Sequence, residues 1–255
     1  MGAHDSITAA IRTAKARGTP ALVAYITAGF PERSKFIPQL KAVAEVADVV
    51  EIGVPFTDPM ADGTTIQRSS RAALAQGVSL KWILAELTEH RPQTRAPLLL
   101  MSYLNPLLAY GLERLPADAE RAGIAGFIVP DLPFEECDDL RRALDARGIA
   151  LVQFVTPVTP LERARMLCEG SSGFVYGITM TGTTGKHVAV PENVLSYFQR
   201  MREISPLPLC AGFGIRSREQ VERLAPYVDG IIVGSALVEV IERGDDPAAF
   251  LQSLR

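Results

Sequence analysis

The segment Gly230-Ile231-Ile232-Val233-Gly234 is apolar along its whole length, and Gly126-Phe127-Ile128-Val129-Pro130 has the same character. A strand with one wet face alternates apolar and polar residues, whereas a parallel strand covered on both faces is apolar throughout. Both segments therefore predict strands of a parallel sheet that is covered on both faces.

Six further strand-like runs lie outward from these two, with helical periodicity between them. The strands are predicted at Leu22–Thr27, Asp48–Val54, Leu98–Ser102, Gly126–Pro130, Ile149–Thr156, Gly173–Ile178, Leu207–Gly212 and Gly230–Gly234. The helices are predicted at Ser34–Val46, Thr65–Ala75, Leu80–Arg91, Leu112–Arg121, Glu135–Arg147, Pro160–Cys168, Pro191–Ile204, Arg216–Leu224, Ala236–Arg243 and Asp246–Leu254. Eight βα units in 255 residues fit a closed (β/α)₈ barrel, the TIM barrel, better than an open doubly wound sheet.

An extra helix is predicted before the first strand. Asp5 or Ser6 is expected to cap it, and its apolar inner face is formed by Ile7, Ala10, Ile11 and Ala14. Since no linker, low-complexity tract or charge block interrupts the chain, residues 1–255 are expected to form one domain.

Composition excludes several classes of function. The formal net charge of −3 gives no basic field for nucleic acid or an anionic membrane. Residues 1–18 lack the apolar run of a signal peptide, which predicts a cytoplasmic protein. The three cysteines and three histidines are widely scattered, so neither a disulfide framework nor a metal site is expected.

Glycine and hydroxyl residues follow the last three predicted strands. They occur in Thr179–Gly185, in Phe213–Ile215 and at Gly234-Ser235. In a barrel of this kind the site lies at the carboxyl ends of the strands, where backbone N–H groups and a helix N-terminus can hold a phosphate. Each glycine alone could serve a tight turn, but three such loops at adjacent strand ends predict a phosphate-binding site.

The stretch from Val49 to Gly63 begins as the second strand and then becomes a loop that contains Pro55, Pro59 and Gly63. Glu51 lies within the strand, while Asp58 and Asp62 lie beyond it. A carboxyl group among apolar side chains should have a raised pKa unless a partner compensates. Glu51 is thus either part of a structural ion pair or an acid–base group.

Candidates for the chemistry are polar side chains near the strand ends, namely Glu51, Asp58, Asp62, Tyr103, Asp131 and Tyr176. None of the five lysines lies on a predicted strand, which argues against a buried Schiff-base lysine. Carboxylate acid–base catalysis remains, and it needs a substrate that supplies its own electron sink.

The block from Glu51 to Gly63, EIGVPFTDPMADG, resembles the signature of the tryptophan synthase α chain family. The resemblance covers essentially the whole chain and includes YITAGFP at 25–31, MSYLNPLLAYG at 101–111, VPDLPFEE at 129–136, GFVY at 173–176, GTTG at 182–185 and GFGI at 212–215. The chain departs from the usual residues of the family in the loop 179–185, at Thr64 and in Thr156–Pro160.

This resemblance implies a lyase that cleaves indole-3-glycerol phosphate to indole and glyceraldehyde 3-phosphate without a cofactor. Glu51 would be the acid–base residue, and Asp62 would accept a hydrogen bond from the indole N–H. The other substrate-binding positions that it implies are Tyr176, Thr184, Gly185, Gly212, Phe213, Gly214, Gly234 and Ser235. For Tyr176, packing as a core aromatic is the alternative.

The resemblance also implies a pyridoxal-phosphate β chain as partner, in an α2β2 assembly. Its contact surface would include Pro55, Asp58, Pro59, Asn105, Pro106 and Tyr110. The apolar residues Leu107, Leu108 and Tyr110 could form an exposed patch or pack beneath a loop. A stand-alone lyase that releases free indole, a different phosphate-ester isomerase and a non-catalytic binding subunit remain as alternatives.

Overall fold

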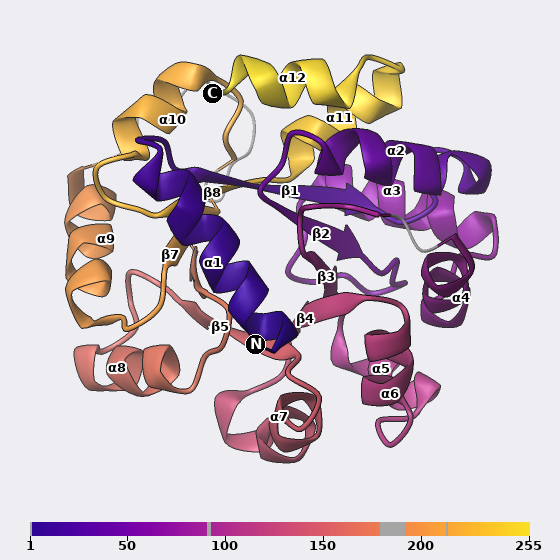
Figure 1. Ribbon diagram of the computed structural model, residues 1–255, viewed down its shortest axis with the longest axis horizontal. Coiled ribbons are helices and arrows are strands. Elements are labelled where there is room, and N and C mark those ends of the chain that lie inside the picture. The colour runs from indigo at the N-terminus through magenta and orange to yellow at the C-terminus, as the bar shows by residue number, and fades with distance from the viewer. Residues whose placement is uncertain (1, 91–92, 179–191, 213) are drawn as a thin grey trace.

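Eight parallel strands close into a barrel in chain order in the computed structural model, which describes residues 2–90, 93–178, 192–212 and 214–255 (Figure 1). The strands are β1 Ala21–Thr27, β2 Val49–Gly53, β3 Leu98–Met101, β4 Ile124–Ile128, β5 Ala150–Val155, β6 Val175–Ile178, β7 Leu209–Gly212 and β8 Gly230–Val233. β1 pairs with both β2 and β8, which closes the sheet. The predicted (β/α)₈ barrel is confirmed.

Helices surround this barrel (Figure 1). In the described part of the chain they are α1 Ala3–Ala16, α2 Phe36–Ala44, α3 Thr64–Ala75, α4 Leu80–His90, α5 Leu104–Tyr110, α6 Leu115–Arg121, α7 Asp138–Asp145, α8 Leu161–Glu169, α9 Glu192–Ile204, α10 Arg218–Leu224, α11 Ser235–Arg243 and α12 Pro247–Ser253, with 3₁₀ turns η1 Arg33–Lys35 and η2 Phe134–Glu136. Of these described helices, none has the length and apolar character needed to cross a membrane.

Two regions differ from the sequence prediction. Helix α5 was not predicted, and the helix expected from Leu112 begins only at Leu115, after Gly111 with its φ of 106°. Strand β4 lies about two residues earlier than expected, because Pro130 has no N–H to give to a β-ladder.

The predicted cap of helix α1 is wrong. The helix begins at Ala3, so neither Asp5 nor Ser6 precedes it. Asp5 instead lies in the first turn, where its Oδ2 accepts a hydrogen bond of 2.9 Å from the Gly2 N–H. A carboxylate in the first turn interacts favourably with the positive end of the helix dipole.

The predicted inner face of α1 is confirmed. Ile7, Ile11 and Ala14 are fully buried, and they pack against side chains that point into the barrel. A β-carbon added to Gly126 of β4 would lie 3.1 Å from Ile7 Cδ1, so the helix sits very close to the strands. Helix α1 therefore closes the amino end of the barrel (Figure 1) and leaves the carboxyl end for a site.

Alternation along β2 decides where its carboxyl group lies. Val49 packs with the residues inside the barrel, whereas Val50 and Ile52 pack between the strands and the helices. Because successive side chains of a strand point to opposite faces, Glu51 and Gly53 face the barrel interior with Val49.

Candidate active site

The carboxyl group of Glu51 is completely buried inside the barrel. Neither Oε1 nor Oε2 has a hydrogen-bond partner among the described residues. Burial in these surroundings disfavours the charged form and raises the pKa of Glu51 to about 8. The side chain therefore carries its proton at neutral pH, and the described residues provide no structural ion pair for it.

Asp62 lies in the loop after β2 and is partly buried. The Ala61 N–H donates a hydrogen bond of 2.9 Å to the hydroxyl oxygen of Tyr103, whose own proton remains available for the Asp62 carboxylate. Burial raises the pKa of Asp62 to about 6, and the hydrogen bond from Tyr103 opposes this rise. Asp62 is therefore mostly ionised at neutral pH.

Two tyrosines reach the barrel interior beside these carboxyl groups. Tyr25 of β1 is paired in register with Glu51, and Tyr176 of β6 packs against Phe154 with ring centroids 4.9 Å apart. Burial, with the nearby carboxylate charges of Asp62 and Glu51, raises the pKa of both phenols. Both side chains are therefore neutral hydroxyl groups at physiological pH.

Tyr25 was not predicted as a site residue. Its place could have been found from the sequence, since the predicted strand puts Tyr25 on the same face as Val23 and opposite a neighbouring strand that carries Glu51. Tyr103 was among the candidates for the chemistry, and its interaction with Asp62 depends on the loop conformation, which the sequence does not reveal.

The other two carboxylates of the candidate set lie outside this constellation. Asp58 is exposed and accepts a hydrogen bond of 2.5 Å from the hydroxyl of Thr57. Asp131 accepts a hydrogen bond of 2.8 Å from the Leu104 N–H at the beginning of α5, which is a structural role.

Gly214 and Gly234 both follow strands at the carboxyl end of the barrel. Gly214 has a φ of 65°, a conformation that L side chains rarely adopt, and Gly234 precedes helix α11, which begins at Ser235. The first N–H groups of a helix have no acceptor within it, so α11 directs unpaired donors towards this end. Gly212 ends β7, whereas Thr184, Gly185 and Phe213 lie outside the described residues.

The surface expected to meet a partner is only partly exposed. Asp58 and Asn105 are exposed, Pro59 and Pro106 are half-buried, and Pro55 is buried. Tyr110 is half-buried and donates a hydrogen bond to Asp118, while the guanidinium of Arg114 lies over its ring.

Only some of the apolar residues considered for a patch beside this surface are exposed. Leu107 is fully buried, so of the two alternatives given for it, packing beneath the surface is the one observed. Leu108 is 51% exposed, and Met60 in the loop after β2 is 85% exposed. Both are large apolar side chains open to a partner, one in the loop after β2 and the other on α5 after β3.

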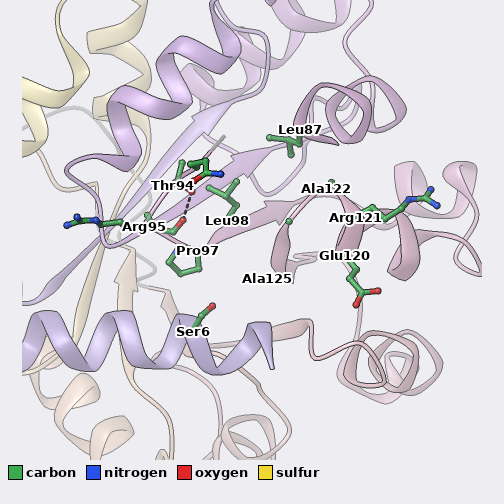
Figure 2. A pocket seen from close by; sticks show the side chains of 13 residues that line it. Ser6, Leu87, Thr94, Arg95, Pro97, Leu98, Glu120, Arg121, Ala122 and Ala125 are labelled. Atoms are coloured by element: carbon green, nitrogen blue, oxygen red, sulfur yellow. Dashed lines mark hydrogen bonds between the residues drawn. The ribbon is translucent and has the colours of Figure 1, made fainter. Parts of the chain in front are cut away.

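A cleft of about 920 Å³ lies elsewhere, where β3 and β4 begin (Figure 2). Its lining includes Ser6 of α1, Thr94 and Arg95 of the segment before β3, and Glu120 and Arg121 of α6. It lies at the amino end of the strands, and its lining contains none of the candidate site residues. In barrels of this type the chemistry occurs at the carboxyl end, so this cleft is not the active site.

The sequence model of the tryptophan synthase alpha chain family matches residues 11–254. The chain belongs to this family. A tryptophan synthase alpha chain from Desulfovibrio desulfuricans is 46% identical over 244 residues, which cover 94% of this chain and 96% of that one. One from Chloroflexus aurantiacus is 43% identical over 233 residues, covering 90% and 87%.

Solved structures agree with this assignment to the tryptophan synthase alpha chain family. The alpha subunit from Legionella pneumophila has a TM-score of 0.88 at 31% identity, covering all of this chain and 97% of that one. A tryptophan synthase from M. tuberculosis in its aminoacrylate-bound form has a TM-score of 0.87 at 30% identity, covering 98% and 97%. The chain is accordingly a lyase of tryptophan biosynthesis that acts on indole-3-glycerol phosphate.

Proposed function

We propose that Glu51 and Asp62 perform this cleavage as a pair of carboxyl groups with opposite protonation states. The observation that carries the proposal is the difference between their surroundings. Glu51 is fully buried with no hydrogen-bond partner among the described residues, and its pKa is about 8, whereas Asp62 keeps a hydrogen bond from Tyr103 and a pKa of about 6. Two carboxyl groups whose pKa values are separated by their environments can act as acid and base at one pH.

In the proposed reaction the protonated Glu51 gives its proton to C3 of the indole ring. The ring then carries positive charge towards its nitrogen, and the Asp62 carboxylate stabilises that charge by accepting a hydrogen bond from the N–H. The bond between C3 and the glycerol side chain breaks, and its electron pair restores the aromatic ring. Glu51, now ionised, takes the proton of the glycerol hydroxyl whose carbon becomes the aldehyde, which restores the starting state.

The phosphate of the substrate is proposed to bind at the ends of β7 and β8. The backbone N–H groups of Gly214, Gly234 and Ser235 are the donors there, because helix α11 adds its positive end at this point. Tyr176 and Gly212 are proposed to line the space between the phosphate and Glu51. Thr184, Gly185 and Phe213 complete the proposed set.

A pyridoxal-phosphate β chain is the proposed partner, in a cytoplasmic α2β2 assembly. The exposed side chains of Met60 and Leu108 support this part of the proposal, since both lie near the carboxyl ends of the strands and neither packs into the core. Asp58, Pro59, Asn105 and Pro106 are proposed to lie in the same contact, whereas the buried Pro55 and the paired Tyr110 would shape it from behind. Replacing Leu108 with Asp should weaken stimulation by a β chain without lowering the activity of the isolated chain.

The test of the catalytic proposal follows indole release from indole-3-glycerol phosphate by purified variants. Glu51→Gln should reduce kcat by about a thousandfold or more while leaving substrate binding nearly unchanged, since the amide keeps the shape but cannot transfer the proton. Asp62→Asn should also lose most activity. Asp58→Asn is the matched control in the same loop and should retain the activity of the isolated chain. Near-normal turnover by Glu51→Gln would refute the proposal.

A further inference from the structure

Three buried hydroxyl groups form a chain that runs from the barrel interior to helix α3. The hydroxyl of Tyr25 lies 3.3 Å from Thr27 Oγ1, which in turn lies 2.7 Å from Ser69 Oγ. The Ser69 hydroxyl donates a hydrogen bond of 2.9 Å to the backbone carbonyl of Ile66. Tyr25, Thr27 and Ser69 are all buried.

The backbone carbonyl of Ile66, at the end of this series of hydrogen bonds, fixes the direction of each bond in it. A carbonyl oxygen can only accept, and each hydroxyl has a single proton to donate. Ser69 gives its proton to Ile66, so it must accept from Thr27. Thr27 has then used its proton and must accept from Tyr25. The phenolic proton of Tyr25 is therefore committed to Thr27, and its oxygen can only accept from any further group.

This acceptor oxygen lies in the active site. β1 and β2 pair Tyr25 with Glu51 and Thr27 with Gly53, and a β-carbon on Gly53 would lie 2.5 Å from Tyr25 Cζ. The phenol thus lies along β2 towards the carboxyl end of the barrel, one inward position beyond Glu51. Asp62, Glu51 and Tyr103 all act electrostatically on it, which places it among the groups assigned above to the chemistry.

We propose that Tyr25 is a substrate-binding residue whose phenolic oxygen accepts a hydrogen bond from a donor group of the substrate. The inference rests on the proposed function, in which the substrate lies between Glu51 and Asp62. The proposed function assigns the ring N–H of indole-3-glycerol phosphate to Asp62, so the donors that suit the Tyr25 oxygen are the hydroxyls of the glycerol chain. A substrate without the donor leaves a buried acceptor unpaired, so Tyr25 selects for it.

The first measurement compares Tyr25→Phe with the wild-type chain. Loss of one neutral hydrogen bond should lower kcat/KM for indole-3-glycerol phosphate by about tenfold. Tyr197→Phe is the matched control, because Tyr197 is equally buried, lies on α9 and has no hydrogen-bond partner for its hydroxyl among the described residues. It should change kcat/KM by less than about twofold.

The second measurement uses two substrate analogues. One lacks the glycerol hydroxyl whose carbon does not become the aldehyde, and the other is methylated at the ring nitrogen and serves as the control, because that N–H is assigned to Asp62. The wild-type chain should cleave the analogue that lacks the hydroxyl bound by Tyr25 less efficiently than the full substrate. Tyr25→Phe should lose about tenfold of this discrimination. A merely structural role for Tyr25 would lower activity on all substrates by the same factor and leave the discrimination unchanged.

Thr27→Val supplies an independent check, since it frees the phenolic proton and lets Tyr25 donate. The discrimination of Thr27→Val between substrate and analogue should fall towards that of Tyr25→Phe. This check also works if Tyr25→Phe folds poorly. Equal discrimination in wild type, Tyr25→Phe and Thr27→Val would overturn the role of Tyr25, while an inactive Glu51→Gln in the same assay would leave the catalytic proposal intact. An active Glu51→Gln would overturn the catalytic proposal instead.

Discussion

Tyr25 of β1 lies across Gly53 of β2, with its ring carbon Cζ 2.5 Å from the place that a β-carbon on this glycine would take. The same relationship recurs on the other side of the barrel, where a β-carbon on Gly212 would lie 2.8 Å from the Tyr176 hydroxyl. In both cases the glycine is paired with the residue two positions beyond the tyrosine on the preceding strand. Each inward tyrosine thus occupies space that only a glycine on the next strand leaves free.

Gly53→Ala should therefore destabilise the protein. The added methyl group must displace a buried ring, and overpacking of this kind costs about 1–3 kcal/mol of the free energy of unfolding. Urea denaturation measures the cost. In the background Tyr25→Leu, which removes the ring, the same glycine substitution should cost clearly less. An equal cost in both backgrounds would contradict the contact.

Stability should depend on pH through Glu51. Its pKa is about 8 in the folded chain, above the ordinary value of 4.5 that it takes on unfolding. Between these two values the folded state holds one proton more than the unfolded state, so the free energy of unfolding falls as pH rises, by about 1.4 kcal/mol per pH unit. Glu51→Gln cannot ionise and should escape this loss.

The difference in stability between Glu51→Gln and the wild-type chain should consequently widen from about pH 5 to pH 8 in favour of the variant. Above pH 8 it should stay constant. Urea titrations at intervals of one pH unit would show this. Parallel stability curves for the two proteins would mean that Glu51 ionises normally.

The pH dependence of turnover should be bell-shaped. Activity needs Asp62 ionised and Glu51 protonated, so kcat/KM should rise through about pH 6 and fall through about pH 8. Because the two groups share one site, these limits describe the pair as a whole. A profile that keeps rising above pH 8 would instead indicate that Glu51 acts first as a base.

The barrel was predictable because its strands are apolar on both faces, but helix α5 was not. Asn105 and Pro106 are typical of a turn, so no helix is predicted over them from the sequence. Pro106 in fact lies in the first turn of α5, where a missing N–H costs nothing because that N–H would have no partner within the helix. The signal for a turn and the signal for a helix start are the same here.

The candidate site was likewise predictable only in part from the sequence. The residue pattern placed Glu51 on the second strand among apolar side chains, and the family resemblance pointed to Asp62, because both signals are local in sequence. The series of hydrogen bonds from Tyr25 through Thr27 to Ser69 joins residues up to 44 positions apart. Only the packing of α3 against β1 brings these residues together. Such hydrogen bonds depend on tertiary distances of a few tenths of an ångström, which no periodicity encodes.

Tyr103 should tune the pKa of Asp62, and Tyr103→Phe tests this directly. The variant keeps the ring, which stacks on Phe56 at 5.1 Å between centroids, and removes only the hydroxyl. That hydroxyl stabilises the ionised carboxylate, so its loss should raise the pKa of Asp62 by roughly one unit. The acidic limb of the kcat/KM profile should move to higher pH, while the basic limb, set by Glu51, stays in place.

Tyr110→Phe is the matched control for this shift. Tyr110 is a half-buried tyrosine that likewise hydrogen-bonds a carboxylate, but its partner is Asp118 of α6, outside the site. Its removal should leave both limbs of the profile of the isolated chain unchanged. If Tyr103→Phe lowered activity equally at every pH, the hydroxyl would shape the loop around Ala61 without controlling the ionisation of Asp62.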